Sequence, residues 1–322
     1  AQAKTMPEFG AGGRQPFFGK TGLDYWLGGK SGLFSMLNPV AIFAGFLLPL
    51  LLPLRQRLPL LLKTTPAFGL LAQLAGASLG CFFMAHVLLF RLHAPNRYTH
   101  YSASIILSMA AAIVLISLAD AAGRWIRPFF PKPVAKSVAK IFVTWVVIGL
   151  MLYPASLKSF LDVLYLAPTQ GTLYEFLAQQ PKDTLVASLS EEADNISTFA
   201  RRSVLVSQEH SIAYHTGYYD QIRQRVIDLI YAQTSPDLGE LQRIIHQYGI
   251  DVWLVDGGAF NPGFMAQSKW LQQFKPAIDD AIATLKQGQS PALRQLMPTC
   301  TIFQEGDIAL IEAACLLSQP EF

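Results

Sequence analysis

The residues between positions 90 and 101 form the densest polar group beside an apolar part of this sequence. This stretch contains two arginines, two histidines and two tyrosines. A planar guanidinium binds phosphate oxygens through paired hydrogen bonds, and an imidazole can assist as a hydrogen-bond or proton-transfer group. The residue types therefore predict a site for a lipid phosphate or another substrate at His93, Arg97, Tyr98 and His100. The alternative is an interfacial role, with the tyrosines in an aromatic belt and the arginines extending to lipid headgroups.

A second group of polar and aromatic residues follows a short predicted strand at 202–207. Open α/β sheets commonly bind ligands in the crevice at the carboxyl ends of their strands, where Glu209 and His210 would lie. We predict a pocket in this region for a sugar or a lipid headgroup. Its candidate residues are Arg202, Glu209, His210, Tyr214, His215, Tyr219 and Arg225. The alternative is that these tyrosines and arginines tie a long loop to the sheet and to the membrane helices.

The familiar sequence signatures of catalysis and cofactor binding are absent. The sequence contains no Cys or His pairs at metal-ligand spacing, no G-x-S-x-G elbow and no Walker loop. No cofactor and no metal site is therefore predicted. Cys300 and Cys315 could pair, but a hairpin predicted around Glu305 and Gly306 places Cys300 opposite Ile311, so we expect no disulfide.

The composition separates this chain from ordinary soluble proteins. Of its 322 residues 52% are hydrophobic and only 15% are charged, whereas roughly a quarter are charged in a typical soluble domain. The formal net charge is +3, without a basic stripe interleaved with aromatic residues. These features predict a lipid bilayer as a partner and argue against nucleic-acid binding.

The apolar residues gather in four runs, at 37–54, 68–90, 102–119 and 141–157. Each is close to the roughly 17 to 25 residues that cross a hydrocarbon core, so we predict a helical transmembrane domain over 37–157. Pro49 and Pro53 predict a kinked or broken first span.

Lysine and arginine in the links predict the orientation of these spans. The links after the first and third spans hold three and five basic residues, and the link after the second holds two. Basic residues favour the cytoplasmic side, so everything after the fourth span is expected on the outer side. The glycine-rich stretch 1–36 is then expected to be a flexible outer loop, because no strand precedes its glycines as in a phosphate-binding cradle.

The rest of the chain, 158–322, is predicted to be an outer α/β domain. Amphipathic helices at 173–180, 220–231 and 238–248 alternate with apolar strands at 184–188, 202–207 and 250–255. This order predicts a three-layer domain with a parallel sheet, and the turn at Glu305 and Gly306 adds a C-terminal β-hairpin at one edge.

Several segments together resemble the C-terminal half of large polytopic proteins of cyanobacteria, which are in turn similar to the GT-C superfamily of membrane glycosyltransferases. The segments are HAPNRYT at 93–99, PKDTLVA at 181–187, RSVLVS at 202–207 and YGIDVWL at 248–254. The resemblance implies an integral protein of a bacterial inner membrane that uses a polyprenyl-phosphate-linked sugar at the outer face.

In the GT-C family the catalytic acidic residue lies in the first outer loop. The resemblance implies that this loop, and any divalent metal bound through it, belongs to a preceding part of a longer protein, so no catalytic residue is assigned here. The alternative function is a non-enzymatic membrane assembly or export component whose outer domain binds a partner or a polysaccharide. An acidic motif in the first outer loop of the complete reading frame would distinguish the two.

Overall fold

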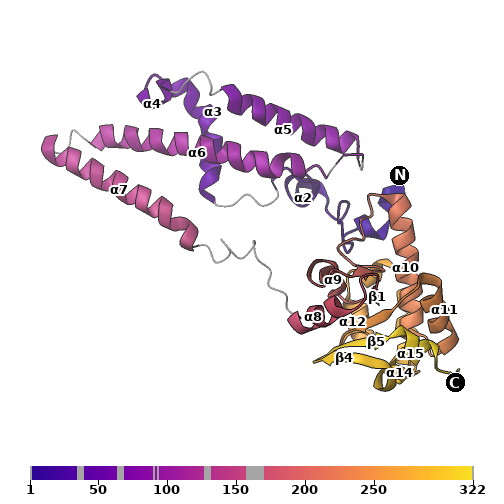
Figure 1. The fold of residues 1–322 in the computed structure, drawn as a ribbon. Helices are drawn as coiled ribbons and strands as arrows, with labels where there is room; N and C mark the ends of the chain where they lie inside the picture. The colour runs from indigo at the N-terminus through magenta and orange to yellow at the C-terminus, as the bar shows by residue number, and fades with distance from the viewer. Residues whose placement is uncertain are drawn as a thin grey trace. The chain divides into compact units, whose positions relative to one another are not determined.

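The computed structural model describes residues 2–34, 40–63, 69–89, 91–92, 94–126, 132–156 and 170–320. His93, one of the candidate site residues, lies outside these ranges. The chain divides into two compact units (Figure 1). One combines Ala1–Pro16 with Ala167–Phe322, and the other is Phe17–Leu166. The N-terminal stretch thus contributes to both units, and it contains the short helices α1 (Gln2–Thr5), η1 (Pro7–Phe9) and α2 (Gly22–Leu27).

The second unit is helical and contains two long apolar helices in its described part. These are α5 (Gly69–Val87) and α6 (Arg97–Ile126), and both are long and apolar enough to cross a membrane. They contact each other through Ser78 and Ser102, whose hydroxyl oxygens lie 2.6 Å apart. Only 11% of the most apolar 18-residue stretch of α5 is buried within the chain, and 28% of the corresponding stretch of α6. Most of their apolar side chains therefore face outward, as expected of helices surrounded by lipid.

The other two predicted spans are not confirmed by the described residues. The first is divided into η2 (Val40–Leu47), α3 (Leu48–Leu51) and η3 (Leu52–Leu54), because Pro49 and Pro53 lack the N–H that continues a helix. In α7 (Lys132–Ser156) the apolar stretch Ile141–Tyr153 is shorter than a full span. The short helix α4 (Pro59–Leu62) precedes α5.

The first unit is built on a five-stranded sheet in the order β2-β1-β3-β5-β4. Its strands are β1 (Leu185–Ser188), β2 (Ser203–Val204), β3 (Val252–Val255), β4 (Thr301–Glu305) and β5 (Ile308–Glu312). Strands β2, β1 and β3 are parallel, while β5 is antiparallel to both β3 and β4. The described residues therefore form an α/β domain with a C-terminal hairpin at its edge, as predicted, but the sheet is mixed, with two parallel and two antiparallel pairings.

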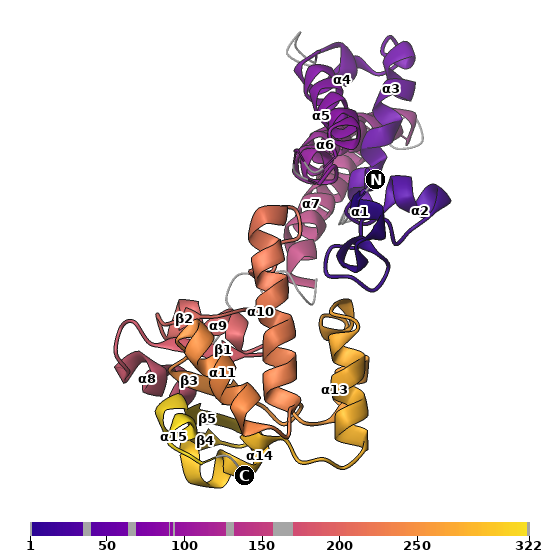
Figure 2. The same cartoon turned by 90° about the vertical axis from the view of Figure 1, so that its right-hand side faces the viewer.

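Helices pack on both faces of this sheet, because neighbouring residues of each strand point to opposite sides. Trp253 and Ile311 face one core and Leu254 and Leu310 face the other. The first face carries α10 (Thr216–Thr234), α11 (Leu238–Tyr248), α12 (Pro262–Gln267), η6 (Leu271–Gln273), α13 (Ala277–Lys286), α14 (Ala292–Cys300) and α15 (Ala313–Leu317). The second carries α8 (Gly171–Gln179) and α9 (Ala193–Phe199). Figure 2 shows α10 and α13 side by side.

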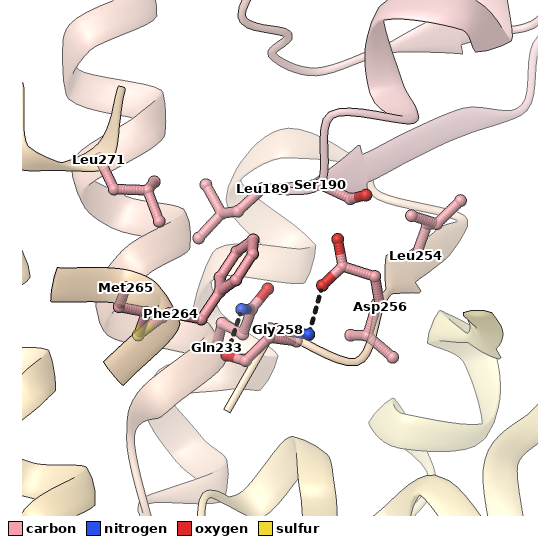
Figure 3. Close-up of a pocket in the computed structure, with 11 residues that line it drawn as sticks. Leu189, Ser190, Gln233, Leu254, Asp256, Gly258, Phe264, Met265 and Leu271 are labelled. Atoms are coloured by element: carbon pink, nitrogen blue, oxygen red, sulfur yellow. Dashed lines mark hydrogen bonds between the residues drawn. The ribbon is translucent and has the colours of Figure 1, made fainter. Parts of the chain in front are cut away.

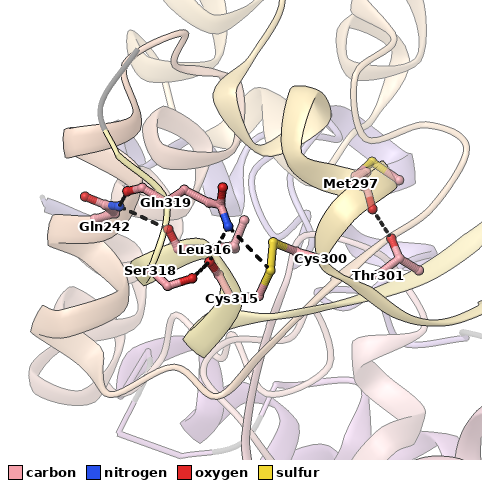
Figure 4. Close-up of a disulfide and its surroundings, with 8 residues drawn as sticks. All are labelled: Gln242, Met297, Cys300, Thr301, Cys315, Leu316, Ser318 and Gln319. Atoms are coloured by element: carbon pink, nitrogen blue, oxygen red, sulfur yellow. Dashed lines mark hydrogen bonds between the residues drawn. A yellow bond between two sulfur atoms is a disulfide. The ribbon is translucent and has the colours of Figure 1, made fainter.

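A disulfide joins Cys300 to Cys315, with 5.5 Å between their Cα atoms, so the expectation of unpaired cysteines is wrong (Figure 4). The hairpin turns at Gly306, whose φ of +55° is readily adopted by glycine. However, Thr301 and not Cys300 lies opposite Ile311. Cys300 ends α14 just before β4, and Cys315 lies in α15 just after β5. The two helices meet beyond the end of the hairpin, which strand register alone could not predict.

Candidate functional site

The described part of the α/β unit contains a crevice at the carboxyl ends of β1 and β3 (Figure 3). The connection leaving β1 passes through α9 on one face of the sheet, and the connection leaving β3 passes through α12 to α14 on the other. Open α/β sheets commonly bind ligands at the point where the connections from two neighbouring parallel strands run to opposite faces of the sheet. The crevice has a volume of about 10 Å³, which is room for about one water-sized group.

Two polar side chains line this crevice from neighbouring strand ends. Ser190 follows β1, and its hydroxyl oxygen accepts a hydrogen bond from the backbone N–H of Glu192 at 3.2 Å. Asp256 follows β3, and its Oδ1 accepts from the backbone N–H of Gly258 at 2.9 Å. Figure 3 shows the Asp256 carboxylate on the Ser190 side of the crevice. A hydroxyl and a carboxylate in this position can form hydrogen bonds with a single hydroxyl group or a water molecule at the mouth of the crevice.

The floor and one wall of the crevice are tightly packed. Gln233 is buried; its Nε2 donates to the carbonyl of Ala259 at 2.9 Å and its Oε1 accepts from the indole of Trp253 at 3.3 Å. The ring of Phe264 lies so close to Gly258 that a Cβ at this position would meet it at 2.5 Å. A side chain at position 258 would therefore require the Phe264 ring to move.

Sequence reasoning placed the strand-end site after β2 and missed Ser190 and Asp256. A carboxylate directly after a continuous buried strand was the available signal, because V-D-G-G ends the apolar run 250–255. Strand order decides which strand ends share a crevice, and this order comes from tertiary packing.

Three of the predicted outer-domain residues contact the N-terminal segment of the chain, residues 2–16. The hydroxyl of Tyr214 donates to Oε1 of Gln15 at 2.9 Å. Glu209 accepts from the guanidinium of Arg14 at 2.8 Å. The remaining member of the three, Tyr219, is buried and donates to the carboxylate of Glu8.

Glu8 is the central contact of this segment and is itself only 2% exposed. Its Oε1 accepts from Tyr219 at 2.8 Å and from the guanidinium of Arg223 at 2.9 Å. Burial, together with the nearby Glu8 carboxylate, raises the pKa of Tyr219, so this hydroxyl keeps its proton and remains a donor. The N-terminal segment therefore covers this part of the predicted pocket.

The other predicted residues of the α/β unit have separate local contacts. Arg202 donates to the backbone carbonyls of Ala178, Gln180 and Ala200, and so fixes the end of α8. The Nδ1 atom of His210 lies 2.6 Å from the hydroxyl of Ser207. His215 begins α10 through its backbone, and Arg225 lies over the ring of Tyr248, 6.0 Å from its centroid.

The predicted lipid-phosphate residues Arg97, Tyr98 and His100 lie in the first turn of α6, in the helical unit. Arg97 is exposed, and its only guanidinium hydrogen bond to a described residue is a long one of 3.4 Å to the hydroxyl of Tyr101. The ring of His100 meets that of Tyr101 edge-on at 4.7 Å. The carbonyl of Tyr98 accepts a hydrogen bond from Ser102 at 2.8 Å and one from Ser78 of α5. Arg97, His100 and Tyr101 are therefore together, whereas Tyr98 takes part in helix packing through its backbone.

No group of three or more His, Cys, Asp or Glu side chains within the described ranges is arranged to hold a metal ion. Comparison of the sequence with protein-family models and with curated proteins found no match.

Proposed function

We propose that this chain forms the membrane and outer-domain parts of a GT-C-like glycosyltransferase that uses a lipid-phosphate-linked sugar at the outer face of a bacterial inner membrane. The observation that carries the proposal is the exposed guanidinium of Arg97 at the first residue of α6. Its weak bond to Tyr101 leaves most of its donors for a ligand. The positive end of the helix dipole adds to the attraction for a phosphate.

An outer location of the α/β domain is supported by two independent features. The basic residues of the links favour the cytoplasmic side, which leaves the α/β domain outside. The disulfide between Cys300 and Cys315 would persist in an oxidising compartment and is uncommon in the cytosol.

The proposal includes four membrane spans. Besides α5 and α6, it takes the predicted first and fourth spans, 37–54 and 141–157, across the bilayer. Ile141, Phe142 and Trp145 of α7 are 57%, 56% and 67% exposed. Side chains this apolar are stable in such positions when lipid or other helices surround them.

The test uses the complete protein reconstituted in vesicles that contain a labelled polyprenyl phosphate. Arg97→Ala should weaken lipid-phosphate binding by about tenfold or more, because a charge-assisted hydrogen bond is lost. Arg124→Ala is the matched control, since Arg124 lies near the opposite end of α6 and pairs with Asp120 at 3.0 Å. Equal binding by both variants and the unmodified protein would remove the Arg97 site.

A non-enzymatic assembly or export component is the second candidate. It is favoured by the strand-end crevice, because Ser190 and Asp256 offer a hydroxyl and a carboxylate to one polar group of a partner bound over the strand ends, without any reaction. Transfer of sugar from a polyprenyl-phosphate donor by the complete protein would support the enzyme. Binding of polysaccharide without transfer under the same conditions would support the second candidate.

A further inference from the structure

The N-terminal segment, residues 2–16, contains a loop that lies on the α/β unit beside the first turns of α10 (Figure 1). The backbone N–H of Gln15 donates to the carbonyl of Glu8 at 2.9 Å, which closes the loop on itself. A Cβ at Gly13 would meet the carbonyl oxygen of Glu8 at 2.2 Å, so the loop passes tightly over its own backbone. Its own backbone therefore shapes the loop, and side chains attach it to the domain.

Two ion pairs of opposite direction attach this loop. The loop supplies a carboxylate, Glu8, to the guanidinium of Arg223, with 2.9 Å between Oε1 and Nη1. It supplies a guanidinium, Arg14, to the carboxylate of Glu209 at 2.8 Å. Such reciprocal charges fix the direction in which a segment binds, because a reversed segment would bring like charges together.

Buried aromatic side chains complete the contact. Phe9 is 2% exposed, and its ring centroid lies 5.7 Å from that of Tyr214. Tyr219 is also buried and donates to Glu8 at 2.8 Å. Tyrosine and arginine are enriched among the residues that dominate the binding energy of protein interfaces. The domain side of this contact, named the docking face from here on, consists of Glu209, Tyr214, Tyr219 and Arg223.

Contacts within the domain hold the central arginine of the docking face in place. Arg223 donates to the backbone carbonyl of Gln273 at 3.0 Å. Its guanidinium also lies over the ring of Phe274, 5.5 Å from the centroid. The cation is therefore positioned from the domain side as well as by the loop.

The loop satisfies the docking face incompletely. Within the described ranges, Oε2 of Glu8 and Nε of Arg14 are buried without a hydrogen-bond partner. A buried polar atom in this state keeps its desolvation penalty. Both atoms belong to the loop, so a segment that pairs these groups should bind the same face more tightly than the loop does.

We propose that the docking face binds an acidic–aromatic segment of a partner protein, and that residues 2–16 occupy it as an internal substitute that the partner displaces. The partner segment carries a glutamate followed directly by an aromatic residue, with a basic residue further along. Charge complementarity selects this chemistry, because Arg223 pairs with an acidic group and Glu209 with a basic one. The inference does not rest on the lipid-phosphate site or on glycosyl transfer.

The test measures fluorescence anisotropy of a labelled peptide with the sequence of residues 2–16, added to the full chain in detergent. Glu8→Ala in the chain weakens the hold of its own loop, so the peptide should bind this variant about tenfold more tightly than the unmodified chain. Adding Arg223→Ala should weaken peptide binding about tenfold, because a charged donor is lost. A peptide that carries Glu8→Gln should bind the Glu8→Ala chain about tenfold more weakly for the same reason.

Arg243→Ala, added to Glu8→Ala, is the matched control. It makes the same charge change on α11, where Arg243 pairs with Glu240 at 2.9 Å. It should leave peptide binding unchanged, and so should Arg97→Ala, which separates this face from the proposed lipid-phosphate site. Thermal unfolding shows whether each variant is folded. If Glu8→Ala is not, Glu8→Gln in the chain takes its place, because it keeps an oxygen for Tyr219.

The inference is overturned if the peptide binds neither Glu8 variant of the chain, or if Arg223→Ala and Arg243→Ala have equal effects. Sedimentation of the unmodified chain in the same detergent tests the other occupant. Concentration-dependent dimers that Arg223→Ala abolishes would also overturn the inference, because the occupant would then be the same loop of a second copy.

Discussion

Removal of the disulfide between Cys300 and Cys315 should destabilise the α/β unit by about 3 kcal/mol. The two cysteines are 15 residues apart in the sequence. A cross-link that closes a loop of this length removes conformational entropy from the unfolded chain worth about 3 kcal/mol at room temperature. Cys300 is 2% exposed, so alanine is the suitable replacement, because it places no polar group in the core.

The loss should be visible as a change in melting temperature. For a domain of about 150 to 250 residues, each kcal/mol lowers the melting temperature by roughly 2 to 4 °C, so the double alanine variant should melt about 6 to 12 °C lower. Thermal unfolding of the purified chain in detergent measures this shift. Reduction of the unmodified protein should produce a shift of the same size, and Cys81→Ala should produce none, because Cys81 is a free, exposed cysteine on α5.

Thiol counting supplies a second, independent measurement. Under denaturing conditions, alkylation of protein isolated from its membrane should modify only Cys81 before reduction and all three cysteines afterwards. Three reactive thiols before reduction would refute both the pairing and the argument that the domain faces an oxidising compartment. An unchanged melting temperature after confirmed reduction would refute the entropic reasoning but leave the pairing intact.

Three further predictions concern the packing of the α/β unit. Glu8→Ala should destabilise it by about 1 to 3 kcal/mol in denaturant unfolding, because Arg223 loses its buried partner but is itself 29% exposed and can be solvated. Burial raises the pKa of Tyr248 to about 12, so the folded state keeps a proton that the unfolded state loses near pH 10. The free energy of unfolding should therefore fall between about pH 10 and 12. In Tyr248→Phe it should fall less steeply over this range. Gly258→Ala should cost about 1 to 3 kcal/mol in thermal unfolding, because its Cβ would meet the Phe264 ring at 2.5 Å.

Matched variants separate these effects from general damage. Glu8→Gln keeps an oxygen for Tyr219 and should be less harmful than Glu8→Ala, so equal losses would contradict the hydrogen-bond argument. Gly217→Ala lies in α10 with nothing within 4 Å of its Cβ and should be tolerated. If Gly217→Ala and Gly258→Ala are equally stable, the close approach of Phe264 is not the constraint. If the stability of Tyr248→Phe depends on pH in the same way as that of the unmodified protein, the Tyr248 hydroxyl is not the cause of the loss of stability.

The local elements of the α/β unit followed from the sequence because their signals are local. The predicted helix at 238–248 matches α11, whose Asp237 cap and Gly249 at φ +64° mark both ends. The apolar runs 184–188 and 250–255 contain β1 and β3. The predicted second strand was longer than observed, because only Ser203 and Val204 pair with β1.

The contacts between distant segments depended on the tertiary structure. The hydrogen bond between Glu8 and Tyr219 joins residues 211 positions apart, and no periodicity of the sequence records such a pairing. The cysteine pairing depends on how α14 and α15 meet, and the strand-end crevice depends on β3 lying beside β1. Residue type and spacing therefore determined which segments are apolar, helical or extended. Which side chains come together was decided by packing around the two cores of the sheet, because burial of those faces is favourable only in one arrangement of the segments.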